Sequence, residues 1–291
     1  MRRWLATMVC TALVGTAALA GCSADLPDGV DGNLTNKWSL PPAAVAWQPV
    51  TEKCFDDLAE TTSQDDYAPI TCGERHIAET YAVGTLPGKP ATAAAGRTSA
   101  YTECARRADA YVGGPWRASR LIVQPVLPAD EAWGSGARWY RCDLAETDPT
   151  GDVVGRDASL LGALKHDPEL LLRCADPTVS GDSVRKMTPV ACARPHRAEF
   201  AGLWTAPKMS LTALEGSPQL SKGCLSVIAR YTGVPNDSMI KYRTGWLGFP
   251  FGAPAWNAGD RTVQCFLWLS GETMQGSYKG AGPKKLKIHY A

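Results

Sequence analysis

The chain has 291 residues, of which 45% are hydrophobic and 20% charged. This length favours about two domains, each long enough to bury a core of its own. Thirty basic and 29 acidic residues give a net charge of +1, which argues against nucleic acid as a partner. The ten cysteines predict metal or redox chemistry in a cytosolic protein and disulfides in an exported one.

The first residues have the features of an export signal. Arg2 and Arg3 precede an uncharged apolar stretch, Trp4–Gly21, which is short for a membrane-spanning helix. The stretch leads into Leu-Ala-Gly-Cys, ending at Cys22, which resembles the lipobox of bacterial lipoproteins. We therefore expect residues 1–21 to be a lipoprotein signal peptide and Cys22 to carry the lipid, palmitate among its acyl chains. The alternative is an ordinary signal peptide in which Cys22 has no role.

Lipid attachment at Cys22 would hold the mature protein at the extracytoplasmic face of the cell membrane, because several acyl chains on one residue give stable anchoring. No later stretch is apolar over about 18 residues, so we expect no transmembrane helix in the mature chain. Residues 22–49 are rich in Pro, Asp, Gly and Asn, which predicts a flexible tether.

The cysteines of the mature chain reveal an internal repeat. Cys54, Cys72 and Cys104 each recur 120 residues later, and Cys142 recurs 123 residues later. A fixed offset of this kind is the sign of a duplication. The later set is Cys174, Cys192, Cys224 and Cys265.

Other residues repeat at the same offsets. The matched pairs are Asp56 and Asp176, Pro69 and Pro189, His76 and His196, Glu79 and Glu199, Pro87 and Pro207, Tyr111 and Tyr231, Gly113 and Gly233, Pro115 and Pro235, Trp133 and Trp256, Gly136 and Gly259, and Arg138 and Arg261. We therefore expect two homologous domains, 50–148 and 170–291, joined by a connector at 149–169.

Each domain is predicted to follow the order β-β-β-α-β-β. In the first, we expect strands near Cys54, at 68–72, 79–85, 121–126 and 138–144. In the second, Ser217 and Pro218 predict the start of the helix, and Gly233 predicts its end. The fold class is therefore α+β, with a mainly antiparallel sheet and one main helix in each domain.

Four cysteines in a domain allow three pairings. We favour Cys54–Cys72 and Cys174–Cys192, which would join adjacent strands, with Cys104–Cys142 and Cys224–Cys265, which would fix each helix to the last strand. The crossed pairings remain the alternative.

Each repeat resembles the septum formation domain of actinobacterial envelope proteins. The resemblance rests on a Pro-x-x-Cys element followed by His-x-x-Glu, then a helical Cys, then Trp, Gly and Arg before the last Cys. The chain reads Pro69-Ile-Thr-Cys72 before His76 and Pro189-Val-Ala-Cys192 before His196. A closing turn follows in each copy, at 158–162 and 276–280. The resemblance implies a part in cell division and names no reaction.

The clearest candidates for a functional polar site are the two His-x-x-Glu pairs, His76 with Glu79 and His196 with Glu199. They could bind a metal or transfer protons. We expect a structural role instead, because positions i and i+3 of a strand point to opposite faces. Each histidine would then bond to backbone groups and each glutamate to a basic side chain. We therefore expect no metal, no cofactor and no catalytic residue.

The tryptophans are candidates for a binding surface. Trp133 and Trp256 repeat, so we expect them in the core. Five others have no aromatic match in the other copy and are predicted to form a surface for a partner. They are Trp116, Trp139, Trp204, Trp246 and Trp268.

These observations predict a non-catalytic, lipid-anchored envelope protein that takes part in septum formation. Its partner would be an envelope or division protein, or cell-wall glycan, and not nucleic acid. The alternative is an enzyme that modifies envelope polymers through the His76/Glu79 and His196/Glu199 pairs. A third reading is a carrier that only presents its two domains.

Overall fold

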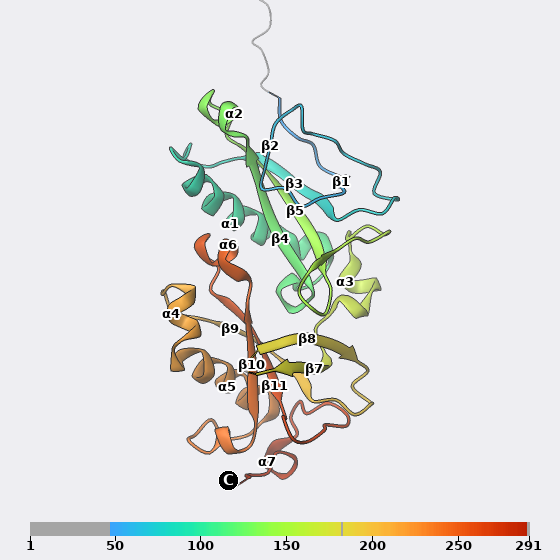
Figure 1. Ribbon diagram of the computed structural model, residues 1–291, viewed down its shortest axis with the longest axis vertical. Coiled ribbons are helices and arrows are strands. Elements are labelled where there is room, and N and C mark those ends of the chain that lie inside the picture. The colour runs from blue at the N-terminus through green and yellow to red at the C-terminus, as the bar shows by residue number, and fades with distance from the viewer. Residues whose placement is uncertain (1–46, 182, 290–291) are drawn as a thin grey trace, which may run out of the picture. The chain divides into compact units, whose positions relative to one another are not determined.

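The computed structural model describes residues 47–181 and 183–289, which belong to one compact unit (Figure 1). The predicted signal peptide, Cys22 and nearly all of the predicted tether lie outside the described residues. Within the described part of the chain, no helix is both long and apolar enough to cross a membrane.

The first half has an antiparallel sheet with one long helix on a face. The strands stand in the order β1-β3-β5-β4-β2, with β6 also paired to β5 and β2 parallel to β4. Helix α1 packs on β4 and β5 (Figure 1). The elements are β1 (Lys53–Phe55), β2 (Thr61–Thr62), β3 (Ala78–Thr85), α1 (Ala93–Val112), β4 (Leu121–Pro128), β5 (Trp139–Thr147) and β6 (Val153–Val154).

The second half has an antiparallel sheet in the order β10-β11-β9-β7-β8, with helix α5 packed on β9, β10 and β11 (Figure 1). Its main elements are β7 (Cys174–Ser180), β8 (Ser183–Val190), β9 (Ala198–Thr205), α5 (Pro218–Thr232), β10 (Gly245–Pro250) and β11 (Thr262–Trp268). Short helices fill the connections of both halves: η1 (Trp116–Ala118), α2 (Asp130–Gly134), α3 (Ala163–His166), η2 (Pro168–Leu170), α4 (Leu211–Glu215), η3 (Ile240–Tyr242), α6 (Gly252–Asn257) and α7 (Gly282–Lys285).

The strands that correspond in the repeat occupy the same places in the two sheets. The order β1-β3-β5-β4 in the first half equals β7-β9-β11-β10 in the second. The α+β class and the antiparallel sheets are therefore as expected. The predicted strand at 68–72 is wrong, since that segment makes only an isolated bridge between Cys54 and Ile70.

The helix ends follow local sequence. Ser217 accepts a hydrogen bond from the Gln219 N–H, and Pro218 occupies the first turn of α5, where a missing N–H does no harm. Gly113 and Gly233 end α1 and α5 with φ of 77° and 75°, a conformation that suits glycine.

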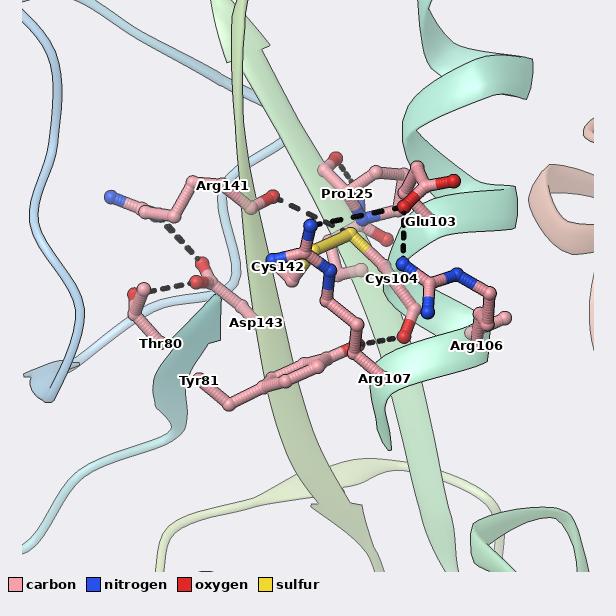
Figure 2. Close-up of a disulfide and its surroundings, with 12 residues drawn as sticks. Thr80, Tyr81, Glu103, Cys104, Arg106, Arg107, Pro125, Arg141, Cys142 and Asp143 are labelled. Atoms are coloured by element: carbon pink, nitrogen blue, oxygen red, sulfur yellow. Dashed lines mark hydrogen bonds and ion pairs between the residues drawn. A yellow bond between two sulfur atoms is a disulfide. The ribbon is translucent and has the colours of Figure 1, made fainter. Parts of the chain in front are cut away.

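The four disulfides join the cysteines in the pairing that the sequence analysis favours. Cys104–Cys142 connects α1 to β5, as Figure 2 shows, and Cys224–Cys265 connects α5 to β11. Cys54–Cys72 and Cys174–Cys192 each close a shorter segment. In the chain-entropy model, loops of these lengths stabilise the fold by about 3–4 kcal/mol each.

The segment 149–169 is not a simple connector. Leu160, Ala163 and Leu164 are buried in the core of the first half, together with Leu170 just beyond it. Burying these apolar side chains in the core stabilises the folded state, so this segment completes the first half. In the second half, the residues after β11 do the same through Met274, which is fully buried.

The two halves also contact one another. Asp260 of the second half accepts hydrogen bonds from the Tyr101 hydroxyl (2.8 Å) and the Arg117 guanidinium (2.7 Å) of the first. The Gln264 amide donates to the Arg117 carbonyl (3.0 Å). Ala255 of α6 lies in the apolar core of the first half. The polar residues of this contact, Tyr101, Arg117, Asp260 and Gln264, do not repeat between the halves, so they are specific to it.

Candidate functional site

His76 and Glu79 lie together in the interior of the first half. His76 precedes β3, in which Glu79 is the second residue, and the two residues are 1% and 2% exposed. His76 Nδ1 lies 2.8 Å from the Glu74 carbonyl oxygen, and Nε2 lies 3.8 Å from Glu79 Oε2. The prediction that the two side chains point to opposite faces is wrong, because His76 belongs to the turn before the strand.

The Glu79 carboxylate joins two other segments, the end of α1 and the closing turn. It accepts hydrogen bonds from the Tyr111 hydroxyl of α1 (2.5 Å), the Ser159 hydroxyl (2.5 Å) and the Leu160 N–H (2.6 Å). The expected basic partner is therefore wrong: neutral donors satisfy this buried carboxylate. A buried charge that accepts several hydrogen bonds is stabilised without a counter-ion at bonding distance.

The second half repeats this arrangement. Glu199 accepts from the Tyr231 hydroxyl (2.6 Å), the Ser277 hydroxyl (2.5 Å) and the Tyr278 N–H (2.7 Å). His196 Nδ1 lies 2.7 Å from the Arg194 carbonyl oxygen. Both copies therefore use a strand glutamate to join the end of the helix to the closing turn.

Burial and the bond to the carboxylate raise the pKa of both tyrosines. The pKa of Tyr231 is raised to about 12, first by burial and then by its hydrogen bond to Glu199. The pKa of Tyr111 is also raised, for the same two reasons with Glu79 as partner. Both phenols therefore stay protonated as donors at neutral pH.

A cysteine lies beside each His–Glu pair, but it is not available as a thiolate. The Cys54 sulfur and the ligand atoms of His76 and Glu79 all lie within 4.8 Å of one another. Because Cys54 and its counterpart Cys174 are in disulfides, each cluster offers a metal only one imidazole and one carboxylate that already has three donors. In both clusters, histidine Nε2 is buried and has no hydrogen-bond partner.

The repeated Trp-Gly-Arg element is also structural. The Arg138 guanidinium lies over the Trp133 ring at 4.0 Å, and that of Arg261 lies over Trp256 at 4.5 Å. Each arginine also donates to the carbonyl oxygen of its tryptophan. Trp133 and Trp256 are buried, as their repetition suggested.

The predicted aromatic surface is wrong. Trp116 and Trp139 are buried in the first half, because α1 and neighbouring rings cover them. Trp204, Trp246 and Trp268 are partly buried and pack on the cores of the second half. Large aromatic side chains fill these cores, so no exposed tryptophan cluster forms in the described residues.

A buried ion pair on β5 gave no signal in the sequence. Asp143 accepts from Arg141 (2.7 Å) and from the Thr80 hydroxyl (2.7 Å), as Figure 2 shows. Burial raises the pKa of Asp143, and Arg141 and the hydroxyl oppose that shift. The corresponding positions of the second half hold Phe266, Gln264 and Phe200, so the repeat could not reveal the network. The network of Thr80, Arg141 and Asp143 lies on the sheet face opposite the Cys104–Cys142 disulfide.

Comparison with known proteins gives the family. The model of the septum formation family matches residues 51–265 as one segment that includes both halves. The chain belongs to the septum formation family. Comparison with curated proteins and with solved structures gives no match. Family membership indicates a role in cell division.

Proposed function

We propose that this protein is a non-catalytic, lipid-anchored envelope protein that binds a partner during septum formation. The observation that carries the proposal is the family match, which covers most of the described residues. The proposal of a lipid anchor at Cys22 rests on the sequence of the first 22 residues, in which two arginines, an apolar stretch and Leu-Ala-Gly-Cys follow one another. The partner is an envelope or division protein, or cell-wall glycan.

The geometry of the His–Glu pairs supports a non-catalytic role. A general acid or base must reach a substrate within hydrogen-bond distance. His76 and His196 are each 1% exposed, and the carboxylates of Glu79 and Glu199 each have three donors from the protein itself. These groups hold the fold together, which makes the enzyme alternative the weaker one.

We also propose that the two halves are homologous domains. The matched residues, the equal sheet orders and the two glutamate clusters support a duplication. The boundaries that fit the packing place residues 149–169 within the first domain, because that segment completes its core.

The proposed function is tested in the source organism by replacing the gene with variants. Cys22→Ala is expected to release the protein from the membrane and to lengthen cells or misplace septa. Proximity labelling from the C-terminus should enrich division proteins, and this enrichment should fall in the Cys22→Ala strain. Uniform labelling of the envelope together with normal division in a deletion strain would contradict the proposal.

The enzyme alternative has its own test. Glu199→Gln removes the carboxylate, and Tyr231→Phe removes only one donor to it, so the pair separates chemistry from folding. A non-catalytic protein should support division in proportion to the amount of folded protein in each strain. Loss of division in Glu199→Gln cells that keep normal protein levels and stability would favour catalysis.

A further inference from the structure

Three segments of the second half meet at the end of the chain. The His289 N–H donates to the Tyr242 carbonyl oxygen (2.8 Å), and the Gly280 N–H donates to that of Tyr231 (2.9 Å). Arg243 donates to the Leu286 carbonyl oxygen (2.7 Å). The end of α5, η3 and the segment around α7 therefore lie side by side and contribute to one region of the surface, which α7 marks in Figure 1.

This surface is strongly positive. Residues 230–243 and 270–289 contain seven basic residues and two acidic ones, a net charge of +5, whereas the entire chain has +1. We call this surface the basic end face. Its basic residues are Arg230, Lys241, Arg243, Lys279, Lys284, Lys285 and Lys287.

Most of this charge is free to meet a ligand. Lys279, Lys284 and Lys287 are exposed, and none forms an ion pair within the described residues. The two acidic residues have partners within the same surface: Glu272 lies 3.4 Å from His289, and Asp237 accepts from the Met239 N–H. Lys285 and Arg243 donate to backbone carbonyls and so have a structural role as well.

An exposed aromatic residue lies within the basic end face. Tyr242 is 38% exposed, one of the few large apolar side chains on the described surface, and the Lys241 ammonium lies 4.9 Å from its ring. A phenol beside a lysine suits the boundary between lipid headgroups and acyl chains, because its ring is apolar and its hydroxyl is polar.

We propose that the basic end face binds anionic phospholipid headgroups of the membrane to which the protein is anchored. This inference rests on the lipid anchoring in the proposed function. The 24 residues between Cys22 and Trp47 can span at most about 80 Å, so a lipid on Cys22 would hold the folded protein beside the bilayer. Lipid attachment and a basic patch together give firmer membrane association than either one alone.

The inference is tested with the chain from Ser23 to Ala291, which lacks the proposed lipid. It is mixed with vesicles of phosphatidylcholine alone, or of phosphatidylcholine and phosphatidylglycerol in equal parts, and the vesicles are sedimented. We expect binding to the anionic vesicles only, weakening as salt is added. Because each lysine near an anionic surface strengthens binding about fivefold, the combined Lys279→Gln, Lys284→Gln and Lys287→Gln variant should bind about 100-fold more weakly.

A matched control removes the same charge elsewhere in the second half. The combined Arg185→Gln, Lys186→Gln and Lys208→Gln variant changes three exposed basic residues outside the basic end face and should keep most of the binding. Tyr242→Ser should weaken binding to vesicles but not to soluble polyphosphate. Equal losses in the two triple variants, or binding to polyphosphate without binding to vesicles, would overturn the inference. Neither lipid attachment nor a division partner enters this assay, so its failure is distinct from failure of the proposed function.

Discussion

Glu79 and Glu199 show how one residue can hold several parts of a fold. Each carboxylate lies on a central strand. It accepts one hydrogen bond from a tyrosine hydroxyl of the helix and two from the closing turn, from a serine hydroxyl and a backbone N–H. A hydrogen bond to a charged group contributes about 1.5–3 kcal/mol, more than a bond between neutral groups. The free energy of unfolding should therefore depend strongly on both residues.

Glu79→Gln tests this dependence. The amide can accept through one oxygen only, so either the hydroxyls or the Leu160 N–H lose their acceptor. We expect the free energy of unfolding, measured by urea denaturation, to fall by about 2–3 kcal/mol. Glu74→Gln is the matched control, because its side chain is exposed in the same turn and should change stability by less than about 0.5 kcal/mol. Equal effects of the two substitutions would contradict the role of the buried carboxylate.

Tyr231 predicts a loss of stability in alkali. In the unfolded chain a tyrosine loses its proton near pH 10, whereas in the folded protein the pKa of Tyr231 is raised to about 12. The folded state then holds a proton that the unfolded state has released, so the contribution is present below about pH 10 and is lost as pH rises through about 12. Urea denaturation between about pH 10 and 12 should show that the free energy of unfolding declines less steeply with pH for Tyr231→Phe than for the parent chain. The same slope in both proteins would contradict a role for Tyr231.

At the scale of elements, the start of α5 depends on a few local contacts. Ser217 accepts from the Gln219 N–H and donates to the Leu214 carbonyl oxygen, so it joins α4 to α5. Ser217→Ala should lower the free energy of unfolding by about 1 kcal/mol, measured by thermal denaturation. Ser217→Asp can still accept from the helix and should recover most of this loss. Recovery by neither Asp nor Asn would indicate that the cap itself matters little.

The elements that could be predicted from the sequence are those with local signals. Ser217, Pro218 and Gly233 predict the bounds of α5, and the repeated cysteines predict the disulfide pairing. The predicted strand at 68–72 is wrong because only Ile70 makes a bridge, to Cys54, before the turn that begins at Cys72. The closing turns were noticed as motifs, but their serines could not be linked to Glu79 and Glu199, since that contact joins residues about 80 positions apart.

Two further parts of the site lay beyond sequence reasoning. The Thr80–Asp143–Arg141 network does not repeat, and a polar residue on a strand ordinarily predicts an exposed face. The five tryptophans without a match in the other half were predicted to form a surface. That prediction is wrong because the absence of a repeat partner says nothing about burial. Trp116 and Trp139 are buried, although neither has an aromatic match in the other half.

At the scale of the whole molecule, Asp260 connects the halves. It is buried and accepts from both Arg117 and Tyr101 across the contact. Burial raises the pKa of Asp260, but the hydrogen bond from Thr262 and the charge of Arg117 outweigh it, so the pKa is lowered. The contact therefore consists of charged and apolar parts, including Trp116 against Phe251, whose ring centroids lie 5.0 Å apart.

A double-mutant cycle measures this connection. Arg117→Gln and Asp260→Asn should each reduce the free energy of unfolding, and together they should reduce it by less than the sum, with a coupling of about 1–2 kcal/mol. Both single variants keep the cysteines and the glutamate clusters intact. Additive effects, or two separate unfolding transitions in the parent chain, would show that the halves are stabilised independently.

The pairing of the cysteines has a consequence for how this molecule is made. In every disulfide the two partners are consecutive cysteines of the described chain: first with second, third with fourth, and so on to Cys265. A chain that is secreted N-terminus first, and oxidised as its thiols emerge, would reach the native set in order of appearance. Each bond could close before the next pair arrives, so biogenesis would require an oxidase but little isomerase activity.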